Sequence, residues 1–199
     1  MQHNNRVPII REALASDTDA VKACVVAAFD IYIERIGKPP APMLLDFPAE
    51  IEARHVWLAE LDAQVVGVLV QYETEEGFYI DTVAVNPHLQ GTGIGKALLQ
   101  FAEQEALRRG YDSIYLCTNV KMTENQIFYP RIGYVEYERK FDNGYDRIFY
   151  RKQLIIKWAE RRYSGIGESA TLQINLSLPN PPILCIIRWP YISSYTVAV

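Results

Sequence analysis

Residues 83–99 read VAVNPHLQGTGIGKALL, in which an apolar strand passes through a glycine-rich turn into the first turns of a helix. The first backbone N–H groups of a helix have no partner within the helix, and the helix dipole adds partial positive charge there. Gly91, Gly93 and Gly95 lack side chains, so a ligand can lie directly against the main chain. This stretch therefore predicts an anion-binding turn suited to a phosphate group.

Two common nucleotide motifs do not fit this turn. A P-loop has four residues between its glycines, whereas Gly91 and Gly95 enclose three. A P-loop also needs a hydroxyl residue after its lysine, and here Ala97 follows Lys96. A dinucleotide fingerprint would place its third glycine at Lys96 and would begin on the first strand of the fold. The spacing therefore disfavours both ATP and a dinucleotide as the ligand.

Strand and helix patterns alternate on both sides of the turn and predict an α/β fold. Three prolines indicate a non-helical loop over residues 37–42. Ser16 is expected to cap the first helix, and Pro130 is expected to end the last one. The predicted strands are 7–11, 55–61, 64–72, 78–85, 113–118, 134–139 and 147–152, and the predicted helices are 16–29, 48–54, 92–109 and 124–129. The strand at 113–118 should lie parallel to the strand at 78–85, because a helical crossover joins them.

A second motif lies at residues 125–134, which read NQIFYPRIGY. This motif and the earlier one with Gln90, Gly93 and Gly95 resemble two sequence motifs of the GNAT superfamily of N-acyltransferases, and they occur in the same order along the chain. The resemblance extends over residues 7–153. It implies a mixed, mostly antiparallel sheet of about six or seven strands with a splayed parallel pair, flanked by about four helices.

The same resemblance implies that acetyl-CoA is the co-substrate and that no metal is required. The backbone amides of the turn would hold the pyrophosphate, and the Lys96 ammonium would add a point charge. Asn125 would contact the pantetheine arm, although its residue type equally suits a helix cap. The expected CoA-binding residues are Val83, Ala84, Val85, Gln90, Gly91, Thr92, Gly93, Ile94, Gly95, Lys96, Asn125 and Phe128.

Transfer of an acetyl group to an amine needs a proton acceptor, a polarised thioester carbonyl and a proton for the departing thiolate. The resemblance implies that Tyr129 donates the proton to the thiolate, although Tyr129 could instead be a core residue. It also implies that the backbone N–H of Val83 polarises the thioester carbonyl. Many relatives carry a glutamate where this chain has Tyr79, so the base stays open. Asp81 shares the face of Tyr79 on an ideal strand and is the first choice, unless it serves as a structural hydrogen-bond partner. Glu76 is the second choice, and a chain of water molecules is the third.

The acceptor is expected to be a primary amine of a small molecule, a peptide or a protein, lined by Tyr32, Glu34, Arg35 and Tyr145. The missing glutamate at Tyr79 leaves a second interpretation open, that of a non-catalytic acyl-CoA sensor or interaction module. A screen of thiol release with many amines would separate the two.

The composition excludes several other classes of function. The chain has 199 residues, 49% of them hydrophobic, and a formal net charge of -4 without a dense basic block, which disfavours nucleic acid. It shows neither a signal region nor an apolar run long enough to cross a membrane. Its three cysteines lie far apart, as in a reducing compartment, so we expect a cytoplasmic protein.

Residues 1–154 are expected to form a single acyltransferase domain, and residues 155–199 a C-terminal extension without an assigned function. Strand patterns occur in the extension at residues 172–178 and 183–187. An exposed edge of the sheet or this apolar extension would allow a homodimer.

Overall fold

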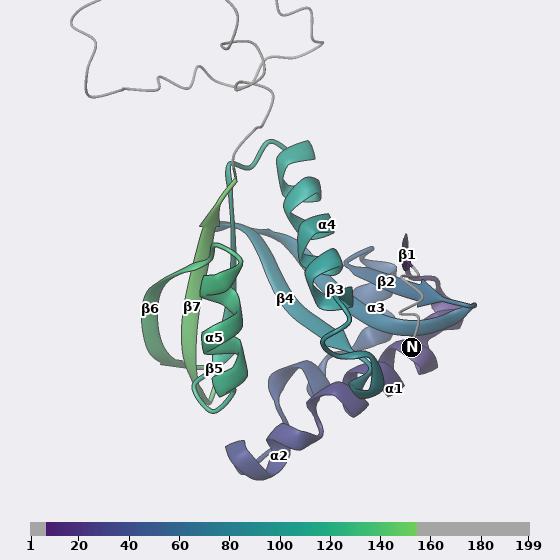
Figure 1. Ribbon diagram of the computed structural model, residues 1–199, viewed down its shortest axis with the longest axis horizontal. Coiled ribbons are helices and arrows are strands. Elements are labelled where there is room, and N and C mark those ends of the chain that lie inside the picture. The colour runs from purple at the N-terminus through teal and green to yellow at the C-terminus, as the bar shows by residue number, and fades with distance from the viewer. Residues whose placement is uncertain (1–6, 155–199) are drawn as a thin grey trace, which may run out of the picture. The chain divides into compact units, whose positions relative to one another are not determined.

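The computed structural model describes residues 7–154, which form one seven-stranded sheet in the order β1-β2-β3-β4-β5-β7-β6 (Figure 1). The strands are β1 (Ile9–Glu12), β2 (Val56–Leu61), β3 (Gln64–Thr74), β4 (Gly77–Val85), β5 (Ser113–Asn119), β6 (Val135–Asp142) and β7 (Tyr145–Gln153). β4 and β5 are parallel, and the other neighbouring pairs are antiparallel. This arrangement confirms the predicted fold class.

The parallel pair separates soon after it forms. The ladder joins Phe78, Tyr79 and Ile80 of β4 to residues 114–116 of β5, and the two strands then diverge (Figure 1). Beyond this point β4 remains paired with β3 on its other side, as far as Val85 opposite Gly67. The later half of β4 therefore has one edge free to bind something other than a strand.

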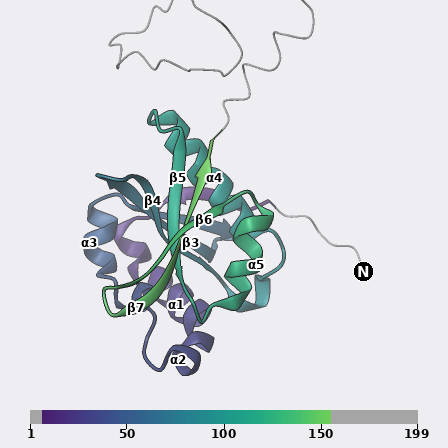
Figure 2. The same cartoon turned by 90° about the vertical axis from the view of Figure 1, so that its left-hand side faces the viewer.

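Helices cover both faces of the sheet. On one face, α1 (Thr18–Phe29) and α3 (Phe47–Glu52) bury side chains against β2 and β3. On the other face, α4 (Ile94–Arg108) and α5 (Thr123–Arg131) contribute to a second core cluster. Figure 2 shows α3 and α5 on opposite sides of the sheet. A fifth helix, α2 (Ile31–Ile36), follows α1 directly.

A β-bulge interrupts β4 at Asp81. Val70 of β3 pairs with Thr82, whereas the next residue, Gln71, pairs with Ile80, so Asp81 has no ladder partner. A bulge adds one residue to one strand and reverses the alternation of its side chains. Phe78 and Ile80 consequently lie in the core under α4, whereas Ala84 lies in the core under α1.

The element predictions were correct for all seven strands, with differences of a few residues at the ends. β2 and β3 form a hairpin with a two-residue turn at Asp62-Ala63, and both turn residues have positive φ. The helix α2 was missed. Within residues 7–154, none of the helices combines the length and apolar character needed to span a bilayer. The strands expected at 172–178 and 183–187 lie outside the described residues.

Three local predictions were wrong. Ser16 does not begin α1; it lies inside a 3-10 turn, and the Asp17 carboxylate accepts the Leu14 N–H at 2.8 Å there. Pro130 lies inside α5 rather than ending it, in the last turn, where its missing N–H costs a single hydrogen bond. The loop expected over 37–42 ends in a 3-10 turn at Ala41–Leu44, because a proline near the start of a helical turn needs no N–H.

Candidate active site

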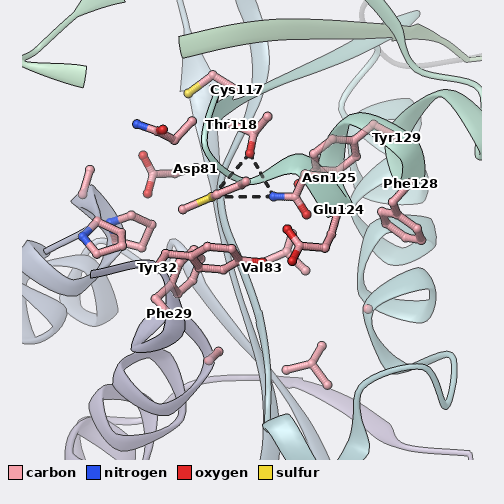
Figure 3. Close-up of a pocket in the computed structure, with 18 of the residues that line it drawn as sticks. Phe29, Tyr32, Asp81, Val83, Cys117, Thr118, Glu124, Asn125, Phe128 and Tyr129 are labelled. Carbon is pink, nitrogen blue, oxygen red and sulfur yellow. Dashed lines mark hydrogen bonds between the residues drawn. The ribbon is translucent and has the colours of Figure 1, made fainter. Parts of the chain in front are cut away.

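A cavity of about 430 Å³ lies where β4 and β5 diverge. Its walls come from both helical layers, from the turn before α4, and from β4, β5 and β7. In Figure 3, Phe29 and Tyr32 lie below and the α5 residues Asn125 and Tyr129 lie to the right, with Cys117 at the top. The predicted site residues that line this cavity are Tyr32, Asp81, Val83, Val85, Gln90, Gly91, Gly95, Asn125, Phe128, Tyr129 and Tyr145.

The glycine-rich turn has the predicted strand-to-helix geometry. Gly91 and Gly93 have φ values of +78° and +96°, a region in which a side chain is strained, and α4 begins immediately afterwards at Ile94. The turn residues Gly91, Thr92, Gly93 and Lys96 are exposed, so the first amides of α4 are open to a ligand. Thr92, Gly93, Ile94 and Lys96 do not line the cavity, and the Ile94 side chain is buried in the core.

The free edge of β4 presents backbone groups to the cavity. Asn86 donates its N–H to Val66 of β3, and groups on alternate residues of an antiparallel strand point to the same side. The backbone groups of Val83 and Val85 therefore point away from β3. The carbonyl of Val85 accepts a hydrogen bond from Nε2 of Gln90 at 3.3 Å, which agrees with this direction. Ala84 is buried on the other side and does not line the cavity.

Tyr129 is a buried phenol at the cavity wall. Its ring packs against the rings of Phe128, Tyr134 and Tyr150. Among residues 7–154, nothing forms a hydrogen bond with its hydroxyl group. Burial raises the pKa of Tyr129 above the usual value, and nearby Cys117 adds to the shift. The phenol therefore keeps its proton at neutral pH and can donate it.

Asp81 is a partly buried carboxyl group held by two hydroxyl groups. Thr82 donates to Oδ2 at 2.8 Å, and Tyr72 donates to Oδ1 at 3.4 Å. Burial raises the pKa of Asp81 above its ordinary value, although these hydrogen bonds and the Arg147 charge act in the opposite direction. A carboxyl group with a raised pKa accepts a proton more readily than an exposed one.

Asn125 joins α5 to β5. Its Nδ2 donates to Oγ1 of Thr118 at 2.8 Å and approaches the Met122 sulfur at 3.7 Å (Figure 3). Asn125 is the third residue of α5, and the position that precedes the helix is Met122, so the side chain of Asn125 does not cap the helix. It lines the cavity with Phe128 one turn later.

Three of the predicted catalytic and acceptor-binding residues lie away from the cavity lining. Glu76 is exposed in the β3–β4 turn, where its carbonyl oxygen accepts a hydrogen bond from Arg151 at 3.4 Å. Glu34 is exposed on α2. Arg35 is also exposed, and it pairs at 2.7 Å with Glu124, which does line the cavity. Of the two acidic residues predicted as the base, Asp81 lines the cavity and Glu76 does not.

Sequence reasoning missed a polar cluster on the same wall. Tyr79 Oη lies 3.1 Å from the Cys117 sulfur, and Arg147 Nη1 donates to that sulfur at 3.4 Å. Arg147 reaches this place because β7 pairs with β5 so that Arg147 stands opposite Asn119. Pairing across strands carries no signal in the sequence of either strand alone. Among the described residues, no group of three or more potential metal ligands lies together.

Comparisons with known proteins agree with this geometry. The family described as acetyltransferase (GNAT) domain matches residues 52–136. An aminoalkylphosphonate N-acetyltransferase of Salmonella typhimurium is 30% identical over 140 residues, which cover 66% of this chain and 88% of the relative.

Solved structures show the same fold. The PaiA N-acetyltransferase of Thermoplasma acidophilum, in complex with coenzyme A, has a TM-score of 0.61 at 15% identity, covering 74% of this chain and 99% of that one. A GNAT-family acetyltransferase of Staphylococcus aureus has a TM-score of 0.62 at 21% identity, with the same coverage of 74% and 99%. The chain belongs to the GNAT family of acetyltransferases and is an acyltransferase.

Proposed function

We propose that this protein transfers the acetyl group of acetyl-CoA directly to a primary amine of a small molecule, without a covalent enzyme intermediate. One observation carries the proposal: the free edge of β4, the phenol of Tyr129 and the carboxyl group of Asp81 border a single cavity. These are the three groups that acetyl transfer to an amine requires.

Acetyl-CoA would bind along β4 and the turn before α4. Its pyrophosphate would accept hydrogen bonds from backbone amides of the turn over residues 91–96, where Gly91, Gly93 and Lys96 are exposed, with the Lys96 ammonium nearby. Its pantetheine arm would pair with the backbone groups of Val83 and Val85, opposite Asn125 and Phe128. A related fold crystallised with coenzyme A supports this donor.

The reaction would proceed in one displacement. Asp81 takes a proton from the acceptor ammonium, and the resulting neutral nitrogen attacks the thioester carbonyl carbon. The backbone N–H of Val83 donates to the carbonyl oxygen as negative charge develops there. The C–S bond breaks, and Tyr129 gives its proton to the departing thiolate. The nitrogen then loses its second proton to the resulting phenolate, and Asp81 releases its proton to solvent, so that free CoA and a neutral amide are the products.

The surroundings of the cavity support a small acceptor. The Tyr145 hydroxyl donates to the carbonyl of Pro39 at 2.6 Å, and Lys38 donates to the carbonyl of Gly144, so the loop after α2 is joined to the β6–β7 turn. The Arg35–Glu124 pair joins α2 to α5. These bridges leave less room for a peptide than for a short amine. The curated relative is named for aminoalkylphosphonates, which are amines of this size.

We further propose that residues 1–154 form the catalytic domain and that residues 155–199 are an extension outside it. The wide spacing of the three cysteines supports the cytoplasm as its location. The edge strand β6 is the surface at which a homodimer would form, since most of its residues are exposed.

Replacement of Tyr129 tests the proposal. Tyr129→Phe removes the proton donor and keeps the ring, so we expect turnover to fall about 10²-fold to 10⁴-fold. Calorimetric titration should give an acetyl-CoA affinity close to that of the wild type. Thiol release at the wild-type rate would remove Tyr129 from its role. An absence of saturable acetyl-CoA binding at millimolar concentration would refute the proposed function itself.

A further inference from the structure

We propose that the acceptor carries an anionic group besides its amine and that Arg147 binds this group, so that Arg147 determines which amines are acetylated. The inference rests on the proposed function and names the class of its acceptor. The anion is an oxyacid group, either a carboxylate or a phosphonate.

The charges around the cavity are asymmetric. Among the described residues that line it, the charged side chains are Asp81, Glu124 and Arg147. Glu124 is neutralised by Arg35 at 2.7 Å. Asp81 is the proposed partner of the amine. Arg147 is thus the one cation among the lining residues, on the same wall as the proposed base.

Arg147 has weak partners for a charged group. Its side chain is 16% exposed, and its Nη1 donates to the Cys117 sulfur at 3.4 Å. Burial raises the pKa of Cys117, so this partner is a neutral thiol, which is a weak acceptor. The carboxylate of Asp142 lies 3.4 Å from the same Nη1, which is long for a charged hydrogen bond.

The remaining donors of Arg147 are available to a ligand. A guanidinium group has five N–H donors in a planar fork, and this shape matches two oxygens of a carboxylate or phosphonate. Within residues 7–154, no acceptor forms a hydrogen bond with Nε or Nη2 of Arg147. Arg147 therefore uses one nitrogen on its two partners and leaves its other donors beside the cavity, where an anion could accept from them.

Arg147 and Asp81 are close enough for one short molecule to reach both. Both side chains line the same cavity, and the Cys117 sulfur, which accepts from Arg147 Nη1 at 3.4 Å, lies 3.1 Å from the hydroxyl group of Tyr79, two residues before Asp81 on β4. The positive charge of Arg147 also acts to lower the pKa of Asp81. An acceptor with its amine and its anion a few bonds apart would place the amine at Asp81 and the anion at Arg147.

The test compares matched amines in the full-length protein. We would measure kcat/KM with β-alanine, 2-aminoethylphosphonate, propylamine and ethanolamine. The wild type should prefer the two anionic amines over the two neutral ones by about 10-fold to 150-fold, the range expected for a charged hydrogen bond. The ratio between β-alanine and 2-aminoethylphosphonate then tells which oxyacid is favoured.

Arg147→Gln should abolish this preference, because kcat/KM for the anionic amines should fall by about 10-fold to 150-fold relative to the neutral amines. Arg147→Lys keeps a point charge but loses the fork, so it should retain part of the preference. Arg151→Gln is the matched control: Arg151 stands four pairs further along β7, does not line the cavity, and its replacement should leave the preference unchanged.

The outcomes separate the inference from the proposed function. Equal use of anionic and neutral amines by the wild type would overturn the inference and leave acetyl transfer intact. An equal loss of Arg147→Gln activity on all four amines would also overturn it, with acetyl-CoA binding and thermal unfolding measured to confirm that the variant is folded. If no amine is acetylated, the proposed function fails. The anionic amines are then titrated by calorimetry into the CoA complex, and binding that does not depend on Arg147 overturns the inference as well.

Discussion

Asp81→Asn should change activity and stability in opposite directions. The substitution keeps the size of the side chain and removes its charge and its capacity as a base. Loss of a general base lowers turnover by about 10²-fold to 10⁴-fold. The hydroxyl groups of Thr82 and Tyr72 both donate to Asp81, and an amide oxygen can keep one of these bonds while the NH₂ group displaces the other.

The effect on stability follows from the pKa. Burial raises the pKa of Asp81 in the folded protein above its value in the unfolded chain. A group of this kind contributes stability that is fully present below its unfolded pKa and is lost as the pH rises through its folded pKa. Each unit of such a shift is worth about 1.4 kcal/mol. The loss of one hydrogen bond costs about 0.5–1.5 kcal/mol at every pH and offsets part of the gain from removing the charge.

The assay is urea unfolding of wild type and variant from pH 4 to pH 8, beside thiol release at the same pH values. The free energy of unfolding of the variant, minus that of the wild type, should become more positive as the pH rises. Wild-type activity should fall on the acidic side of its pH profile, and this fall should occur at a higher pH than the ordinary pKa range of an aspartate. Glu76→Gln is the matched control, since Glu76 is exposed and outside the cavity, and it should change neither quantity.

Two results would refute this reasoning. Turnover of Asp81→Asn within about threefold of the wild type would exclude Asp81 as the base and favour a water chain. A stability difference that stays flat or falls as the pH rises would mean that the Asp81 carboxylate is not destabilised by burial.

Two glycine substitutions test the support of the donor site. In Gly67→Ala the new Cβ would lie 3.0 Å from Leu98 Cδ1 and 3.1 Å from Ile94 Cγ2, so overpacking beneath α4 should lower the free energy of unfolding by about 1–3 kcal/mol; an unchanged urea midpoint would contradict it. In Gly93→Ala nothing lies within 4 Å of the new Cβ, but the φ of +96° strains it by about 1–2 kcal/mol. Acetyl-CoA affinity measured by calorimetry should fall in Gly93→Ala, and an affinity equal to that of the wild type would show that the turn does not hold the donor.

The sequence predicts best the features that depend on neighbouring residues. The strand-to-helix geometry at Gly91 and Gly93 follows from local backbone preferences and is as expected. Strand positions follow from runs of β-branched and apolar residues, such as those of β3. The two motifs that carry the family resemblance are also short and local, which is why the sequence alone could propose a CoA site at this turn.

Features that depend on contacts between distant segments were not predicted. The bulge at Asp81 depends on how β3 and β4 pair, and Arg147 enters the cavity through the register of β7 against β5. The short helix α2 was missed because it follows α1 without a break in the chain's polar and apolar pattern. Ser16 was expected to cap a helix because serine is a common capping residue. In the structure the neighbouring Asp17 is held by Arg11 at 2.7 Å and also accepts the Leu14 N–H, so Ser16 lies within a 3-10 turn instead.

The bulge at Asp81 divides β4 into two parts that can change independently. Before it, Tyr79 and Asp81 present polar groups to the cavity and contact Tyr72 and Cys117. After it, Val83 and Val85 turn their side chains toward α4. Substitutions of Tyr79 or Asp81 would therefore alter which amine fits, whereas Phe78 and Ile80 between them pack beneath α4 and would have to stay apolar. A single strand can therefore keep the residues that bind a common donor while the residues that contact the acceptor change.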